Sequence, residues 1–240
     1  MASTYFISDA HLGAGPPERE RLKQDKILGF FEHVARTGDR LFIVGDLFDF
    51  WFEYRSVIPK GYTRIFCGLN RLKERGIELN YVAGNHDFWM RDYLVSEFGF
   101  RLYFDEVEWT SAGKKFYIFH GDGLAKDDTG YRLLKRVFRN RINIFLYSLL
   151  HPDLGIPFAR WMSSLSRRYT SRNEVPPDDD YLIRATRKFD EGFDYAIFGH
   201  LHYPRYQEFG TRAYINLGDW IENFSYAEFN GSELRLLNWK

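Results

Sequence analysis

Eight side chains that can hold metal ions or move protons stand at or just beyond the ends of short apolar runs in this sequence. They are Asp9, His11, Asp46, Asn85, His86, His120, His200 and His202. The runs are typical of buried strands. They occupy residues 5–8, 41–45, 81–84, 116–119 and 195–199. Carboxylate, amide and imidazole ligands in this number suit a bridged pair of divalent metals, so the sequence predicts a dimetal centre of the kind that hydrolyses phosphoesters.

The spacing within these motifs fits metal coordination. Residues two apart on an extended segment point the same way, so Asp9 and His11 can reach one metal together. Asp46 has two carboxylate oxygens and can serve one metal with each. His200 and His202 can reach different metals from a turn. A single histidine is more often structural, but five of the seven histidines follow strand-like runs, which favours one shared site.

The elements that must position these residues alternate between strand-like and helical segments. Three segments have side chains on one helical face. These faces are Ile27, Leu28, Phe31, Val34 and Ala35; Ile65, Phe66, Leu69 and Leu72; and Leu182, Ile183, Thr186 and Phe189. The alternation predicts a layered α/β fold with its site at the carboxyl ends of the strands. Runs at 213–217, 225–229 and 234–237, with a turn at Asn230-Gly231, predict hairpins that complete a sheet.

One long interval interrupts the alternation. The first four motifs, from Asp9 to His120, follow one another at 35 to 39 positions, whereas 80 positions separate His120 from His200. We therefore expect a helical cap inserted into the core. The expected core comprises residues 1–122 and 176–240, and the expected cap comprises residues 123–175.

The cap segment combines apolar helices with basic residues. Its first part carries an apolar stripe, and a second aromatic segment surrounds Phe158 and Trp161. The stripe consists of Leu134, Val137, Phe138, Ile142, Phe145, Leu146 and Leu149. Residues 126–175 hold ten basic and four acidic side chains. This pattern suits an anionic amphiphile or a bilayer surface, and it equally fits an ordinary buried helical hairpin with a solvated rim.

Composition bounds the class of protein. The 240 residues are 45% hydrophobic, which is enough to bury a substantial core. Lys plus Arg and Asp plus Glu number 33 each, so the global charge does not point to a nucleic-acid partner. The only cysteine, Cys67, excludes an internal disulfide and fits a reducing compartment, so we expect a cytoplasmic protein.

We expect neither a signal peptide nor a membrane span. The N-terminus enters a strand-like run by Tyr5 without a basic region followed by an apolar stretch. The longest strongly apolar stretch, residues 142–150, is shorter than the roughly 20 residues that a spanning helix needs.

The order of the motifs resembles the five-block signature of the calcineurin-like metallophosphoesterases. The blocks are Asp9-Ala10-His11, Gly45-Asp46, Gly84-Asn85-His86-Asp87, His120-Gly121-Asp122 and Gly199-His200-Leu201-His202. The resemblance implies a four-layer αββα sandwich with two metals between the sheets. One metal is then held by Asp9, His11, Asp46 and His202. The other is held by Asp46, Asn85, His120 and His200.

In such an enzyme the two cations neutralise the phosphoester charge and lower the pKa of a bridging water. The resemblance leaves His86 for chemistry, where it can donate a proton to the leaving oxygen or stabilise the transition state. We expect Asp87 to orient it. The alternative is that His86 only packs over the metals. Asp49, close to Asp46 in the sequence, is a less favoured ligand.

A narrower resemblance is to the UDP-2,3-diacylglucosamine diphosphatases of lipid A biosynthesis, which release lipid X and UMP. The segments that carry it are residues 45–51, 120–124 and 127–131, with the helical insertion after them. It implies an acyl-chain site in the cap, peripheral contact with the cytoplasmic face of the inner membrane, and head-group contacts from Asp128, Tyr131 and Arg132. Asp128 can equally be a helix N-cap. The best-known members have Arg where this chain has His86.

Two other classes compete with this interpretation. The first is hydrolysis of another phosphodiester, such as a nucleotide, a cyclic nucleotide or nucleic acid, whose binding would weaken steeply with salt. The second is a non-catalytic binding module on a retained metal fold. We favour the lipid enzyme with two divalent metals, Mn²⁺ by resemblance, with Zn²⁺ or Fe²⁺ as alternatives. We expect neither a nucleic-acid nor a protein partner.

Overall fold

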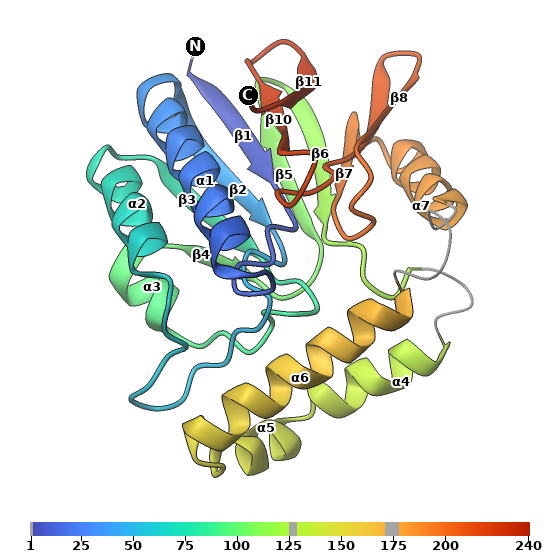
Figure 1. The fold of residues 1–240 in the computed structure, drawn as a ribbon. Coiled ribbons are helices and arrows are strands. Elements are labelled where there is room, and N and C mark those ends of the chain that lie inside the picture. Colours follow the sequence, from blue (N-terminus) through green and yellow to red (C-terminus); the bar gives the residue numbers. More distant parts are fainter. Residues whose placement is uncertain (1, 125–128, 171–177) are drawn as a thin grey trace.

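Two β-sheets face each other at the centre of the structure (Figure 1), a computed structural model that describes residues 2–124, 129–170 and 178–240. Side chains are described in these ranges except at 129, 131–134 and 163–170. The first sheet has the order β11 (Leu234–Asn238), β10 (Ser225–Phe229), β1 (Ser3–Ile7), β2 (Gly38–Val44), β3 (Glu78–Val82), β4 (Arg101–Tyr103). The second has the order β5 (Val107–Ser111), β6 (Lys114–Phe119), β7 (Tyr195–Phe198), β9 (Arg212–Asn216), β8 (Arg205–Phe209).

Helices cover the outer face of each sheet. Strands β1 to β4 run parallel because a helix crosses over between each pair. These helices are α1 (Pro17–Thr37), α2 (Thr63–Glu74) and α3 (Tyr93–Phe98). On the other side α7 (Asp179–Asp190) packs Tyr181, Ala185 and Phe189 against the second sheet. The predicted αββα sandwich is confirmed, and the three predicted helical faces lie on α1, α2 and α7.

An aromatic core joins the two sheets. The ring of Phe6 on β1 stacks on Phe42 of β2 at 5.2 Å between centroids, and on Phe116 of β6 at 6.2 Å. All three side chains are buried. Because both sheets are anchored to this core, the loops at their carboxyl ends are held over a rigid base.

The C-terminal strands contribute to both sheets. Sequence analysis predicted hairpins that complete one sheet. In the structure β8 and β9 form an antiparallel pair in the second sheet, whereas β10 and β11 form one in the first. The reason is that β10 pairs with β1 while β9 pairs with β7, so the chain crosses between the sheets after residue 216.

Three further helices lie together beside the ends of β1 and β2 (Figure 1). They are α4 (Thr129–Phe138), α5 (Arg141–Ser148) and α6 (Pro152–Thr170). The apolar stripe extends over two helices because Asn140 begins a new one, with its side chain accepting a hydrogen bond from the Ile142 N–H. We refer to α4, α5 and α6 as the cap helices. No helix in the described part of the chain is both long and apolar enough to cross a membrane.

Candidate metal centre

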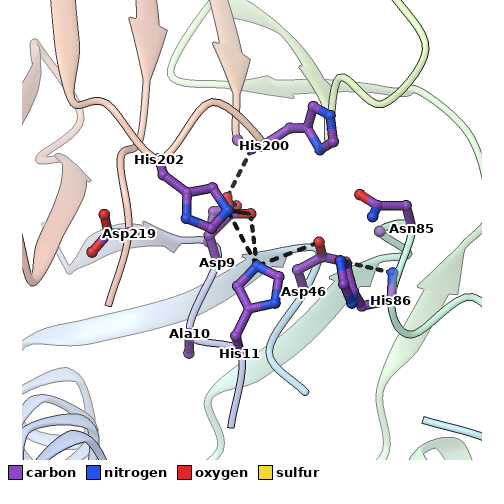
Figure 2. Close-up of polar contacts among 12 residues, drawn as sticks. Asp9, Ala10, His11, Asp46, Asn85, His86, His200, His202 and Asp219 are labelled. Carbon is purple, nitrogen blue, oxygen red and sulfur yellow. Dashed lines mark hydrogen bonds and ion pairs between the residues drawn. The ribbon is translucent and has the colours of Figure 1, made fainter. Parts of the chain in front are cut away.

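Eight predicted residues meet where five strands end. Strands β1, β2, β3, β6 and β7 each lead into a loop that carries at least one of them. Figure 2 shows several of these side chains converging from separate loops. The residues that the structure brings together are Asp9, His11, Asp46, Asn85, His86, His120, His200 and His202.

Asp9, His11 and His202 form the first group of possible ligands. The Nε2 atoms of His11 and His202 lie 3.2 Å apart. Asp9 Oδ1 lies 3.3 Å from His202 Nε2 and 3.7 Å from His11 Nε2. The three atoms therefore face a common point.

Asp46, His120 and His200 form a second group, with Asn85 beside it. Asp46 Oδ2 lies 3.4 Å from His120 Nε2. Asn85 Oδ1 lies 3.1 Å from the same nitrogen. An amide oxygen, a carboxylate oxygen and imidazole are thus gathered around a second point.

Asp46 connects the two groups through a single oxygen. Its Oδ2 lies 3.7 Å from His11 Nε2 as well as 3.4 Å from His120 Nε2. Its Oδ1 accepts a hydrogen bond of 2.9 Å from the backbone N–H of His86. The sequence suggested one oxygen for each metal; in the structure Oδ2 faces both groups, whereas Oδ1 holds the next loop.

The donor spacing fits metal ions. Two donors about 2.1 Å from one ion lie roughly 3.0 to 3.4 Å apart at right-angled or tetrahedral geometry. The 3.2 Å separation of the His11 and His202 nitrogens has this value. Among the described residues no hydrogen bond reaches the buried Asp9 Oδ1. A cation would supply the partner that this oxygen lacks.

Carbonyl groups fix the ring orientation of two histidines. The Nδ1–H of His120 donates to the Val44 carbonyl at 2.9 Å, so its Nε2 is the atom directed at Asp46. The Nδ1–H of His86 donates to the Asp49 carbonyl at 2.8 Å. Such hydrogen bonds set the tautomer and aim of a metal-binding or proton-transferring imidazole.

The carboxylates dominate the electrostatics of the cluster. Burial alone would lower the pKa of His11, but Asp49, Asp9 and Asp46 raise it to about 10. Burial opposes the charged form of His120 too, yet Asp46 raises the pKa of that ring to about 10. The pKa of His200 is lowered to about 4 by burial and by His120. Excess negative charge therefore draws protons onto two rings, and divalent cations can replace them.

Backbone strain accompanies this arrangement. Five of the eight residues have positive φ, a region that non-glycine residues rarely adopt. They are Asp9 (56°), His11 (43°), Asp46 (54°), His200 (72°) and His202 (57°). Such strain persists only where the surrounding contacts hold it, and it is concentrated at functional sites.

Comparison with known proteins agrees with this geometry. The family model for calcineurin-like phosphoesterases matches residues 2–204. The chain belongs to the calcineurin-like phosphoesterase family. Members of this family use divalent metals, and the clusters described above could hold them. This phosphoesterase is therefore a hydrolase with a candidate centre for divalent metal.

Curated relatives resemble this phosphoesterase over nearly their whole length. A UDP-2,3-diacylglucosamine hydrolase from Porphyromonas gingivalis is 31% identical, covering 97% of this chain and 95% of the relative. One from Haemophilus influenzae is 30% identical, covering 94% and 93%. Among solved structures, an archaeal phosphodiesterase covers 98% of both chains with a TM-score of 0.50 and 13% identity, which supports the fold alone.

Asp87 does not orient His86, contrary to the sequence-based expectation. One Asp87 oxygen accepts from the Tyr81 hydroxyl, and the other accepts from the Gly84 N–H at 2.9 Å. Burial and the nearby Asp46 raise the pKa of Asp87 to about 7. The buried carboxyl of this phosphoesterase thus holds the third motif loop, and Asp49 takes the orienting role instead.

Sequence reasoning gave Asp49 too little weight and missed two other supporting residues. Asp49 Oδ1 lies 3.5 Å from His11 Nδ1, and its carbonyl holds His86. The hydroxyl of Ser8 contacts Asp9 Oδ2, which also accepts from the His200 N–H at 2.8 Å. Asn216 donates to the Gly199 carbonyl at 2.8 Å. The spacing of Asp46 and Asp49 was a usable signal, whereas Ser8 and Asn216 carry none.

The predicted head-group residues cannot be placed in the same way. Asp128 lies outside the described residues. Tyr131 and Arg132 lie on α4, and their side chains are outside the described part.

An apolar cavity opens between the cap helices and the motif loops. It has a volume of about 760 Å³. Phe52, Phe88 and Trp89 line it from the loops, and Ile144 and Phe145 line it from α5. Its charged lining is Arg91, Arg139, Arg141, Glu53 and Asp105. Phe88 and Trp89 follow Asn85 and His86 in the sequence, so the third motif contributes both to the cavity and to the metal cluster.

Proposed function

We propose that this phosphoesterase cleaves the pyrophosphate of UDP-2,3-diacylglucosamine to give UMP and 2,3-diacylglucosamine 1-phosphate, lipid X. One combination carries the proposal: relatives named for this substrate align along nearly the whole chain, and the segment that follows Asn85 and His86 lines an apolar cavity bordered by arginines. A pyrophosphate requires cations, and acyl chains require apolar enclosure. The alternative of a nucleotide or nucleic-acid substrate has no comparable support.

The proposed cofactor is a pair of divalent metals, preferably Mn²⁺. Oxygen and imidazole donors without thiolate suit Mn²⁺, and also Zn²⁺ or Fe²⁺. The first ion would be held by Asp9, His11, Asp46 and His202. The second would be held by Asp46, Asn85, His120 and His200. When bound, such a pair activates water and neutralises charge on the phosphate oxygens.

His86 is the proposed proton-transfer residue. Its Nδ1–H is used by the Asp49 carbonyl at 2.8 Å, so proton exchange with substrate takes place at Nε2. Burial lowers the pKa of His86. A lower pKa makes the protonated ring a stronger acid toward the leaving phosphate oxygen, and it also reduces the fraction of rings that carry the Nε2 proton, so turnover through this route should fall as pH rises.

The cavity beneath the cap helices is the proposed acyl-chain site. Phe52, Trp89 and Ile144 supply apolar surface, and burial of each methylene there would contribute about 0.8 kcal/mol to binding. Arg139 and Arg141 at the cavity can pair with phosphate oxygens. Asp128, Tyr131 and Arg132 remain proposed contacts to the head group.

The outer face of the cap helices is proposed to rest on the cytoplasmic surface of the inner membrane. Large apolar side chains there are strongly exposed, including Ile142 (67%), Leu149 (67%) and Leu154 (68%). No residue of α5 is buried. A soluble monomer rarely exposes such a patch without a partner, and neighbouring arginines would favour anionic lipid. The substrate would then enter from the bilayer.

Phosphorus NMR tests the proposed substrate directly. Mn²⁺-loaded protein would be incubated with UDP-2,3-diacylglucosamine, UDP-glucose, a cyclic nucleotide and bis(p-nitrophenyl) phosphate in separate reactions. We expect rapid, Mn²⁺-dependent release of UMP and lipid X from the acylated substrate alone. Turnover of the generic diester without turnover of the lipid would preserve the phosphoesterase chemistry and reject the lipid substrate.

A further inference from the structure

A buried lysine lies beneath the first metal-ligand loop. Lys23 on α1 is only 4% exposed. Its Nζ donates to the carbonyl oxygens of Ala10 at 3.0 Å and His11 at 2.7 Å. It also pairs with Glu20 Oε1 at 2.7 Å. A buried ammonium is costly unless it is paired and hydrogen-bonded, and here it has both kinds of partner.

Glu20 binds backbone N–H groups of the same loop. Its Oε2 accepts from the Gly13 N–H at 2.7 Å, and its Oε1 accepts from the Gly15 N–H at 2.8 Å. Lys23 therefore binds the carbonyl groups of the loop while Glu20 binds its N–H groups. Together they hold residues 10–15 against one turn of α1, and we refer to Lys23 and Glu20 as the clamp.

The loop needs this fastening because of its conformation. Asp9 and His11 both have positive φ, at 56° and 43°. Their N–H groups donate to the carbonyls of Gly45 at 3.1 Å and Asp46 at 2.9 Å. The carbonyls of residues 10 and 11 point the opposite way, toward α1, where the Lys23 ammonium satisfies them. The His11 carbonyl also accepts from the Ala14 N–H at 3.2 Å, so loss of the ammonium would mainly affect the Ala10 carbonyl and would favour rearrangement of the loop.

We infer that Lys23, supported by Glu20, is a positioning residue for one of the two metals: the ion held by Asp9, His11 and His202. The inference rests on the proposed dimetal function. Three ligands of the other ion, Asn85, His120 and His200, come from other loops. The clamp reaches that ion only indirectly, through the hydrogen bonds of Asp9 and His11 to the Asp46 loop and to His200, so its binding should depend on the clamp far less. Substituting Lys23, which is not itself a metal ligand, should therefore weaken one metal site more than the other.

The experiment is a Mn²⁺ titration of metal-free wild-type and Lys23→Met proteins by calorimetry, with metal analysis after gel filtration. We expect wild type to bind two ions. In Lys23→Met one ion binds roughly 10- to 100-fold more weakly, as for other losses of support behind a ligand, and the second keeps its affinity. At limiting Mn²⁺ the variant retains one ion. Excess Mn²⁺ restores kcat, with KM for substrate unchanged.

Two further variants keep the test decisive. Glu20→Gln weakens the N–H side of the clamp and removes the charge partner of Lys23 but keeps the ammonium, so it should produce a smaller loss at the same ion even if Lys23→Met folds poorly. Arg21→Met removes an exposed cation from the same helix turn and should bind both ions normally. The inference is overturned if Lys23→Met keeps both affinities, or loses both equally. If wild type itself binds no pair of ions, the dimetal proposal fails first.

Discussion

Asp46 combines a place in both groups of possible metal ligands with loop positioning in one carboxylate. Oδ2 faces both metal groups, while Oδ1 accepts the His86 N–H. Because both oxygens of Asp46 have close neighbours, little space remains around its side chain. A Cβ added at Gly84 would lie 2.0 Å from Asp46 Oδ1, so glycine is required there by close approach. The third motif loop and the bridging ligand are therefore fitted to each other.

Replacing Gly84 by alanine should disrupt the metal centre without removing a ligand. The added methyl group must displace Asp46, and we expect metal affinity to fall on the order of 10- to 100-fold. Metal content after dialysis measures this loss. Gly130→Ala is the control, because a Cβ there meets no atom of the described residues within 4 Å. Full metal content in Gly84→Ala would mean that Asp46 is not the bridge.

Metal binding should release protons. In the metal-free cluster the pKa values of His11 and His120 are raised to about 10, so both rings are protonated at pH 8. Coordination requires neutral nitrogen, so about two protons should leave, and apparent affinity should fall as pH decreases. Calorimetry in buffers of different ionisation enthalpy counts them. A buffer-independent heat would contradict the assignment of these rings as ligands.

His86→Ala should separate metal binding from turnover. We expect both ions to remain and kcat to fall roughly 10²- to 10⁴-fold, the usual contribution of a proton-transferring side chain. Metal analysis and steady-state rates provide the two measurements. His151→Ala, at an exposed histidine of the cap helices, is the matched control. Near-normal turnover in His86→Ala would exclude His86 from the mechanism.

Residue types could be predicted from sequence, but side-chain directions could not. Seven candidate ligands and His86 come together because strand ends meet at one edge, a consequence of parallel topology. The neighbour relation of His86 and Asp87 was misleading, since adjacent residues point to different sides and Asp87 turns to Tyr81. Lys23 gave no signal, because its role depends on where α1 packs.

At the scale of elements, Trp89 attaches the cap helices to the third motif loop. Its indole N–H donates to the Phe138 carbonyl at the end of α4, at 2.9 Å. The same ring stacks on Tyr147 of α5, with centroids 5.4 Å apart. Tyr147 in turn donates to the Gly155 carbonyl of α6 at 2.6 Å. All three cap helices are thus connected, directly or through Tyr147, to a residue three positions after His86.

Trp89→Leu should impair the acylated substrate selectively. Loss of the stacked ring and of one hydrogen bond removes about 2 kcal/mol, enough for up to roughly a 30-fold rise in KM. The rate with bis(p-nitrophenyl) phosphate, if this diester is turned over, should change little. Trp161→Leu, at an exposed indole of α6, is the control. Equal losses on both substrates would indicate general damage to the centre.

Element types were largely readable from the sequence, whereas their partners were not. The helical faces of α1, α2 and α7 follow from periodicity. The break at Asn140 was hidden, because an apolar stripe continues across two helices when the turn between them preserves its phase. The partition of β9 and β10 between sheets depends on long-range pairing with β7 and β1, which a local pattern does not contain.

At the scale of the whole molecule, the cap helices have two apolar faces. One packs on Phe50, Phe52 and Tyr54 of the core, and the other is open. The sequence left a buried hairpin and an interfacial cap as alternatives. Among the described residues, the exposed fraction of 67% at both Ile142 and Leu149 argues against a hairpin buried in the core.

Leu149→Glu should weaken binding to vesicles of anionic phospholipid. Replacing a leucine that would be inserted into the bilayer by a charged side chain should reduce partitioning onto the vesicles by about tenfold or more. Co-sedimentation with vesicles measures it. Val95→Glu, at an exposed apolar residue of α3 away from the cap helices, is the control and should partition like wild type. Equal partitioning of Leu149→Glu and wild type would reject the open face as a bilayer contact.

The contact between the Asp9 carboxylate and the His200 N–H, which joins residues 191 positions apart, has a consequence for how the protein is made. At about 5 to 20 residues per second, the ribosome delivers His200 roughly 10 to 40 seconds after Asp9. Throughout that interval the first two carboxylate ligands have no histidine partner from the last motif. The nascent chain therefore cannot complete the candidate metal centre before its last motif has been synthesised.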